Sequence, residues 1–220
     1  ARLRDSGVAT LPNLAEWLDL VALGTVADVV PLDTNNRILV WQGLSRIRAG
    51  KCRPGIRALL EIANRDASKL AASDLGFALG PRLNAAGRLD DMSVGVALLL
   101  SEDLGQARML AAELDALNQT RKEIEQGMPS EALALCNSLE QKSEELPLGI
   151  AMYHPDWHQG VVGILASRLK ERFYRPVIAF APAGDGTLKG SGRSIAGLHM
   201  RDVLERLDTL NPGLIIKFGG

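Results

Sequence analysis

Residues 148–181 read LGIAMYHPDWHQGVVGILASRLKERFYRPVIAFA, and this stretch decides the fold class that we expect. Two short apolar runs, 148–153 and 176–181, have the composition of strands. Between them, the apolar residues of 160–173 recur at helical spacing. Strands that alternate with helices are typical of a small α/β domain.

The same alternation continues to the end of the chain. We expect a strand that passes into a loop at 187–194, a helix at 199–207 and a strand at 214–218. The chain starts without an initiator Met and stops at Gly219-Gly220, directly after the last expected strand. We therefore expect a trimmed fragment of a longer protein, with its second domain at 147–220.

Upstream of this domain, residues 104–139 are rich in good helix formers. They predict one long helix, or two helices joined at Gly127-Met128-Pro129, since proline removes a backbone donor. Residues 101–160 carry 11 acidic and 4 basic side chains, which favours a solvated connector over 104–146 with few contacts to either core along much of its length. The alternative is a solvated helix whose charge has no such meaning.

The first part of the chain, residues 1–103, has mostly helical patterns. The expected helices are 14–23, 35–48, 56–63, 73–79 and 93–100. The segment 80–89, with Gly80, Pro81 and Gly87, breaks the pattern and predicts an irregular loop. The expected fold is α/β, with a mostly helical first part, a long linker helix and a small α/β domain.

The composition excludes several classes of protein. No run approaches the roughly 20 apolar residues that a membrane span needs, and the charged residues 1–7 do not have the pattern expected of a signal peptide. The net charge of −1 argues against an indiscriminate nucleic-acid binder. Cys52 and Cys136 lie far apart without zinc-type spacing, which suits a reducing cytoplasm.

Asp28 is the first candidate for chemistry. It lies between Val26-Ala27 and Val29-Val30, and a buried ionised carboxylate needs a partner or a metal. Oxygen ligands of this kind suit Mg²⁺ or Mn²⁺. We expect Asp28 to be shielded from solvent at the floor of a cleft between two domains; the alternative is an aspartate at a helix end or on the surface.

Three further segments carry polar residues suited to an anion. Arg82, Asn84 and Arg88 lie in the glycine- and proline-containing segment 80–89, and arginine binds phosphate in a bidentate way. Ser191, Arg193 and Ser194 lie among glycines in 190–194, which predicts a phosphate cradle. His158 precedes Gly160 and Gly163 at the start of a helix. The alternatives are solvated loops, a β-turn and a surface histidine.

Taken together and in this order, the motifs resemble those of the RecJ exonucleases, in the DHH phosphoesterase superfamily. Residues 18–32 (LDLVALGTVADVVPL) resemble the family's fourth motif, and 80–89 (GPRLNAAGRL) resemble another of its segments. Residues 158–164 and 190–194 resemble two motifs of the accessory domain called DHHA1, and Gly219-Gly220 resembles the start of a third.

The resemblance implies a function. The family hydrolyses single-stranded DNA from its 5′ end, in DNA repair and recombination, with two divalent ions between its domains, usually Mn²⁺ or Mg²⁺. Asp28 then matches a metal-ligating, catalytic aspartate. Ser191, Arg193 and Ser194, together with Arg82, Asn84 and Arg88, match DNA-binding residues, and His158 matches a substrate-side residue.

The resemblance also implies an organisation and partners. Residues 1–103 would be the C-terminal part of a DHH domain, 104–146 the linker and 147–220 a truncated DHHA1 domain. Expected partners are single-stranded DNA, single-stranded-DNA-binding protein and a helicase, for a cytoplasmic monomer without a membrane.

The chain departs from the family in one respect that bears on activity. It has no Asp-His-His triplet and no histidine before His154, and one aspartate cannot hold two cations. The activity is thus expected of the parent protein and not of this fragment. Two alternatives remain open, a DHH phosphodiesterase for nano-RNA or cyclic dinucleotides and a DHH-type scaffold without metals.

Overall fold

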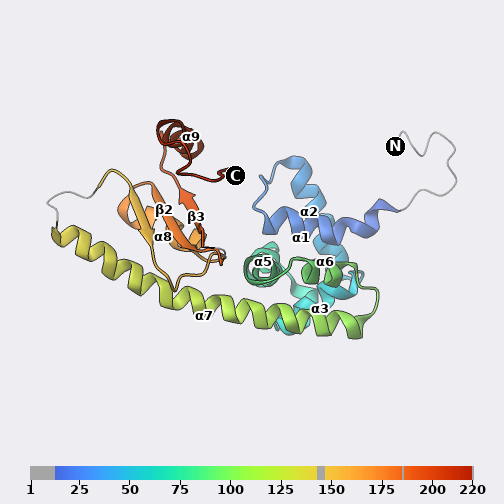
Figure 1. Cartoon of the computed structure of the whole chain (residues 1–220). Helices are drawn as coiled ribbons and strands as arrows, with labels where there is room; N and C mark the ends of the chain where they lie inside the picture. The colour runs from blue at the N-terminus through green and yellow to red at the C-terminus, as the bar shows by residue number, and fades with distance from the viewer. Residues whose placement is uncertain (1–12, 143–146, 185, 220) are drawn as a thin grey trace. The chain divides into compact units, whose positions relative to one another are not determined.

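The computed structural model describes residues 13–142, 147–184 and 186–219, and for residues 127–142 it describes the backbone alone. The chain divides into two compact units, Ala1–Gln119 and Thr120–Gly220. The first unit is helical and the second contains the sheet, while the long helix α7 (Leu104–Lys142) contributes to both (Figure 1).

The first unit consists of short helices around one apolar core. Its elements are the 3-10 turn Leu14–Trp17, α1 (Leu18–Ala27), α2 (Thr34–Arg48), α3 (Pro54–Ile62), the 3-10 turn Ala67–Lys69, α4 (Ala72–Asp74), a π-helical turn (Leu75–Leu79), α5 (Gly80–Leu89), α6 (Ser93–Leu100) and the first part of α7. Asn13 caps the first turn, because its side chain accepts a hydrogen bond from the Ala15 N–H.

Two glycines allow the helices of this unit to approach closely. A Cβ on Gly43 of α2 would lie 2.1 Å from the Leu18 carbonyl oxygen of α1, and one on Gly55 of α3 would lie 2.2 Å from the Leu98 carbonyl oxygen of α6. Backbones packed at this distance leave no room for a side chain. Cys52 is half-buried against the same core, and burial raises the pKa of its thiol.

The segment 80–89 is helical, so the expected loop is wrong. The Gly80 N–H donates to the Leu75 carbonyl, which is the i−5 pattern of a π turn, and α5 continues from that turn. Pro81 lies at the start of α5, where the missing N–H is tolerated. Leu83, Ala85 and Ala86 are buried, so core packing outweighs the low helix propensity of the glycines and the proline.

The prediction of a helix at 104–139 is confirmed, because α7 runs without a break from Leu104 to Lys142. The expectation that it makes few contacts with either core is wrong for its first half. Ala107, Ala111 and Leu114 are buried in the core of the first unit. Arg108 donates to Glu61 of α3 at 2.7 Å and holds the pKa of that carboxyl below its usual range. The acidic composition did not reveal this apolar stripe.

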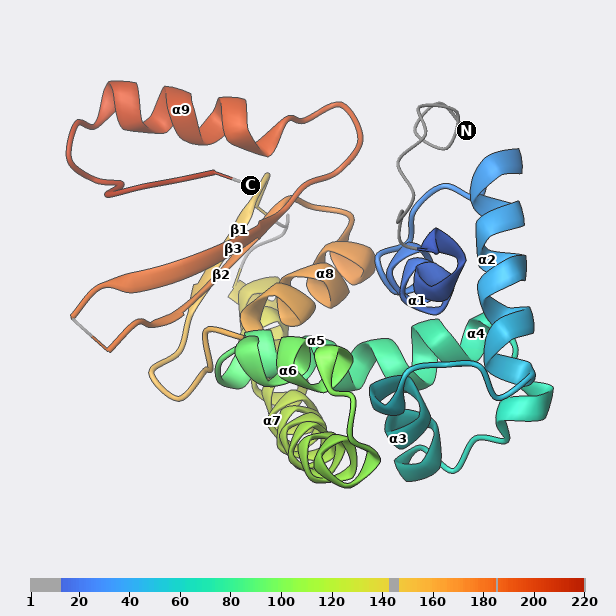
Figure 2. The ribbon, with the colours of Figure 1, turned by 90° about the vertical axis from the view of Figure 1, so that its right-hand side faces the viewer.

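The second unit contains a three-stranded sheet in the order β1-β2-β3. The strands are β1 (Ile150–Tyr153), β2 (Val177–Pro182) and β3 (Leu188–Arg193), with β1 parallel and β3 antiparallel to β2. Helix α8 (Val162–Phe173) connects β1 to β2 and packs on the face of Val177 and Ala179, while α9 (Met200–Leu210) lies on the other side (Figure 2). The α/β prediction is confirmed.

The expected strand at 214–218 is wrong, since these residues have no regular secondary structure. A strand is stabilised by its partner strand, and the described sheet has only the three strands above. Ile216 is 83% exposed as a consequence.

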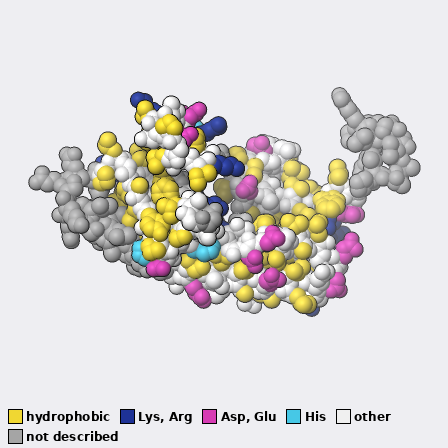
Figure 3. Space-filling model, viewed as in Figure 1, with side chains coloured by type: hydrophobic (Ala, Val, Ile, Leu, Met, Phe, Trp, Pro, Cys, Tyr) yellow, Lys and Arg dark blue, Asp and Glu magenta, His cyan; other side chains and the backbone are white. Residues whose placement is uncertain are grey.

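Hydrophobic side chains are exposed on both units (Figure 3). The most exposed large ones include Phe77 and Leu148. None of the helices in the described ranges combines the length and the apolar character that crossing a membrane requires.

Candidate functional site

Asp28 lies directly after α1, in the turn that ends the helix. The Val30 N–H donates to the Thr25 carbonyl at 3.0 Å, and the Val29 N–H donates to the Val26 carbonyl at 3.2 Å. This pair of bonds is a Schellman motif, whose second-last residue adopts the left-handed conformation. Val29 does so with φ 56°, although glycine is the usual residue there. The turn therefore holds Asp28 at the helix end.

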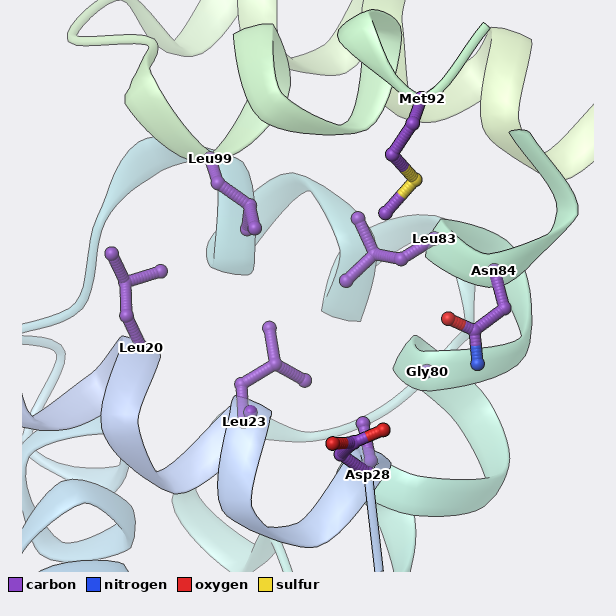
Figure 4. A pocket seen from close by; sticks show the side chains of 10 residues that line it. Leu20, Leu23, Asp28, Gly80, Leu83, Asn84, Met92 and Leu99 are labelled. Atoms are coloured by element: carbon purple, nitrogen blue, oxygen red, sulfur yellow. The ribbon is translucent and has the colours of Figure 1, made fainter. Parts of the chain in front are cut away.

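Asp28 and Asn84 line one pocket in the first unit (Figure 4). The pocket has a volume of about 270 Å³ and lies between α1, α5 and α6. Its remaining lining is apolar or glycine: Leu20, Leu23, Gly24, Ala27, Gly80, Leu83, Met92 and Leu99. Asp28, at the end of α1, and Asn84 of α5 are far apart in sequence, and together they form the polar part of the lining of this otherwise apolar pocket.

The expectation that Asp28 is shielded from solvent is wrong, because its side chain is exposed. Val29 and Val30, which follow it, are themselves exposed, with Val29 at 86%, whereas Val26 and Ala27 before it are partly buried against the core. A position for Asp28 in a cleft between the two units stays a prediction.

The buried carboxylate of α1 is Asp19, a residue that the sequence did not single out. It is 0% exposed and accepts hydrogen bonds from the Leu20 N–H at 2.8 Å and the Arg53 N–H at 2.9 Å. The Arg53 guanidinium lies 3.9 Å from it and also 3.9 Å from the centre of the Trp17 ring. Asp19 is therefore a structural residue that joins α1 to the start of α3.

The described residues do not by themselves fit a site for two metal ions. Asp28 and Asn84 offer a carboxylate and an amide oxygen, both of the kind that Mg²⁺ and Mn²⁺ accept. Within the ranges that the structure describes, no group of three or more His, Cys, Asp or Glu side chains is placed to hold a metal. Among the described residues, Asp28 could supply at most one carboxylate to such a site.

Helix α5 places its three candidate residues on different sides. Asn84 and Arg88 are four residues apart on one exposed face. Arg82 points elsewhere: its Nε donates to the Asp115 carboxylate of α7 at 2.8 Å and its Nη1 to the Ala78 carbonyl at 2.7 Å. With 15% of its side chain exposed, Arg82 is mainly a structural link between helices, while Asn84 and Arg88 face solvent.

In the second unit, Ser191 and Arg193 lie on one face of β3, against α8. Arg193 Nε donates to Ser167 Oγ at 2.9 Å, and Nη1 donates to Ser191 Oγ at 3.0 Å and to the Gly192 carbonyl at 2.8 Å. A guanidinium has five N–H donors. Among the described residues, these bonds use three of them and include no carboxylate. The two N–H groups of Nη2 on this exposed side chain are thus available for an anion.

The motif that contains these residues differs from the expected cradle in two respects. Gly190 and Gly192 belong to the strand, and they make room for neighbours: a Cβ on Gly190 would lie 2.6 Å from the Phe180 ring, and one on Gly192 would lie 3.1 Å from Met200. The Ser194 hydroxyl donates to the Leu198 carbonyl at 2.5 Å, so it stabilises the turn after β3.

His158 lies in the turn before α8 and is half-buried. Its Nδ1 accepts a hydrogen bond from the Gly160 N–H at 3.1 Å, which leaves the proton of the neutral ring on Nε2. Its carbonyl accepts from Val161 and Val162. The described contacts connect His158 to the start of α8.

Sequence reasoning missed Ser167 and Asp115, which hold the two arginines. Ser167 follows Gly163 by four residues, so the helical spacing of the pair was a usable signal. Asp115 lies 33 residues from Arg82, and no local pattern connects them.

The chain is similar to known proteins over nearly its whole length. Residues 147–220 match the family model of the DHHA1 domain. The chain is 80% identical, over 99% of its length, to the single-stranded-DNA-specific exonuclease RecJ of Escherichia coli, and spans 39% of that protein. It is 36% identical to the RecJ of Thermus thermophilus over 96% of its length, and spans 28% of that relative.

The chain is also similar to solved structures of RecJ exonucleases. A structure of exonuclease RecJ bound to manganese matches with a TM-score of 0.77 and 34% identity, over 99% of this chain and 50% of that one. The magnesium complex of Thermus thermophilus RecJ matches with a TM-score of 0.76 and 35% identity, over 96% of this chain and 31% of that one. The chain spans two fifths or less of these curated relatives.

Proposed function

Since the chain is homologous over nearly its whole length to a segment of the RecJ exonucleases, we propose that it is part of a metal-dependent 5′→3′ exonuclease for single-stranded DNA. The enzyme hydrolyses phosphodiester bonds during DNA repair and recombination. Residues 1–103 belong to its DHH domain, 104–146 to the linker and 147–220 to its DHHA1 domain.

Asp28 is the metal ligand that this chain contributes. Its exposed position on a strained turn, beside the Asn84 amide, supports this role, because a ligand must be accessible and fixed in direction. Two Mn²⁺ or Mg²⁺ ions, once bound, would stabilise the attacking and leaving oxygens of the displacement. Their other ligands come from the part of the protein outside this sequence.

DNA contacts come from both units. Asn84 and Arg88 have the exposure to meet a phosphate, whereas Arg82 contributes by holding α5 against α7. In the second unit, Ser191 and Arg193 bind phosphate, Ser194 shapes the turn beside them and His158 offers its Nε2–H.

The observation that carries this proposal is that Arg193 is hydrogen-bonded to neutral groups and has no carboxylate partner among the described residues. A surface arginine held by three hydrogen bonds, without a carboxylate among the described residues, keeps its positive charge for an external anion. The contact is to the DNA backbone and carries no sequence information, as a degradative enzyme requires.

The test uses the full-length exonuclease with Arg193→Ala and poly-dT at several salt concentrations. The variant should bind all single-stranded sequences more weakly, and the slope of log affinity against log salt should fall by about 0.7, the value for one lost contact. Arg168→Ala is the matched control, because Arg168 on α8 is paired with Glu125. An unchanged slope for Arg193→Ala would refute the assignment.

We also propose that single-stranded-DNA-binding protein and a helicase are partners of the whole enzyme, which acts as a cytoplasmic monomer. The two widely separated cysteines support a reducing compartment.

A further inference from the structure

Ser167 lies in the second turn of α8, directly beneath the Arg193 side chain. Its hydroxyl accepts a hydrogen bond from Arg193 Nε at 2.9 Å and donates one to the Gly163 carbonyl at 3.1 Å. The donation to a carbonyl four residues earlier fixes the direction of the hydroxyl lone pairs. Ser167 thus presents an oriented acceptor to the guanidinium.

We propose that Ser167 is a positioning residue for DNA binding, which acts by holding the Arg193 guanidinium in its binding orientation. Nε is the donor closest to the flexible stem, so a bond there restricts the side-chain torsions. Ser191 and the Gly192 carbonyl hold Nη1, and the plane of the group is then set. The direction of the two Nη2 N–H groups follows, because the guanidinium is rigid.

Gly163 is the second part of the same arrangement. A Cβ at this position would lie 3.0 Å from Arg193 Nη2 and 3.0 Å from Ser191 Oγ. The guanidinium therefore lies close to the first turn of α8, where only glycine leaves it undisturbed. Gly163 gives room to one end of the group and Ser167 anchors the other, and they are neighbours on one helix face.

The benefit of this arrangement is entropic. An arginine that is ordered before DNA arrives does not lose its rotamer freedom on binding. The ordering cost of one long side chain is about 0.5–1.5 kcal/mol, which corresponds to an affinity change of about 2- to 10-fold. This inference rests on the proposed function, since it assumes that Arg193 contacts DNA.

The first experiment compares Ser167→Ala with Ser45→Ala in the full-length exonuclease. Ser45 of α2 is a matched control, because its hydroxyl donates to the Trp41 carbonyl in the same i−4 geometry and holds no arginine among the described residues. Both variants should have similar thermal stability. Ser167→Ala should bind oligo-dT about 2- to 10-fold more weakly, and Ser45→Ala should bind it like the wild type.

The second experiment repeats Ser167→Ala in the Arg193→Ala background. If Ser167 acts through Arg193, the added substitution has no further effect on DNA affinity, because the effects of substituting two interacting residues do not add. Gly163→Ala, which would place a Cβ 3.0 Å from Arg193 Nη2, should also weaken DNA binding in the wild type and have no further effect in the Arg193→Ala background. An equal loss of affinity in both backgrounds would show a general structural role and overturn the inference.

The two proposals fail differently. If Arg193→Ala leaves affinity unchanged, the assignment of Arg193 to DNA binding fails. If Arg193→Ala weakens binding and Ser167→Ala does not, only the positioning role of Ser167 fails.

Discussion

Asp19 in α1 and Asp28 directly after it, nine positions apart, differ in their surroundings. Asp19 is 0% exposed and accepts two backbone hydrogen bonds beside Arg53. Asp28 is exposed at the helix end beside the pocket. The cost of burying a carboxylate therefore applies to Asp19, which has its partner, and not to Asp28.

This difference predicts opposite results for alanine substitutions. Asp19→Ala should lower the free energy of unfolding by about 3 kcal/mol, because it leaves the Leu20 and Arg53 N–H groups without their acceptor and removes the carboxylate beside the Arg53 guanidinium. Asp28→Ala should change it by less than about 0.5 kcal/mol, as expected for an exposed site. Urea denaturation followed by circular dichroism measures both, and similar midpoints for the two variants would contradict the assignment.

At the scale of elements, the packing of α1 against α2 depends on one glycine. Gly43 lies against the Leu18 carbonyl and the Ala22 side chain, at 2.1 and 2.5 Å from an added Cβ. Gly24 of α1, also inside a helix, has nothing within 4 Å of an added Cβ. The same substitution therefore meets a neighbouring backbone in one place and open space in the other.

Gly43→Ala should cost about 1–3 kcal/mol of the free energy of unfolding, because the helices must separate. Gly24→Ala should instead stabilise the chain by about 0.5–1 kcal/mol, the difference between alanine and glycine within a helix. The midpoints of thermal unfolding of Gly43→Ala and Gly24→Ala, each compared with the wild type, measure these two changes. A destabilised Gly24→Ala protein would show that the space beside Gly24 is not open.

Helix α7 illustrates how ion pairs fix an element to its surroundings. In the first unit Asp115 holds Arg82, and in the second Glu125 accepts from both Arg121 and Arg168. The Arg82–Asp115 and Arg121–Glu125 pairs are partly buried, so solvent screens them less than a fully exposed pair, whereas the Arg168 side chain is 52% exposed. These contacts, with the buried alanines, make α7 a packed element of each unit rather than a free connector.

At the scale of the whole molecule, metal chemistry needs more ligands than the described residues provide. The described residues contain no group of three or more metal-binding side chains, and the chain spans 39% of its Escherichia coli relative. Asp28 can contribute one ligand, and a two-ion mechanism requires several more.

The purified chain should accordingly release no mononucleotides from single-stranded DNA when Mn²⁺ or Mg²⁺ is added. The full-length exonuclease should do so, and Asp28→Ala should abolish this activity without unfolding the protein. Release of labelled nucleotide in both proteins, with and without chelator, is the measurement. Metal-dependent release by the chain alone, lost in Asp28→Ala, would show that the site is complete.

The sequence by itself determined the α/β class, the long helix at 104–139 and the location of the motifs. These depend on local composition and periodicity, which a sequence displays directly. It placed Asp28, Asn84 and Arg193 among the candidates through residue chemistry and the resemblance of whole motifs.

Tertiary structure decided the conformation of 80–89 and 214–218 and the burial of each aspartate, because these depend on contacts between residues distant in sequence. Packing of Leu83, Ala85 and Ala86 made 80–89 a helix, and that helix separated Arg82 from Asn84. The run at 214–218 has the composition of a strand but no partner strand among the described residues. Asp19 became the buried carboxylate because the Arg53 N–H, 34 residues away in the sequence, donates to it. Burial and pairing are properties of the folded chain, and no local pattern contains them.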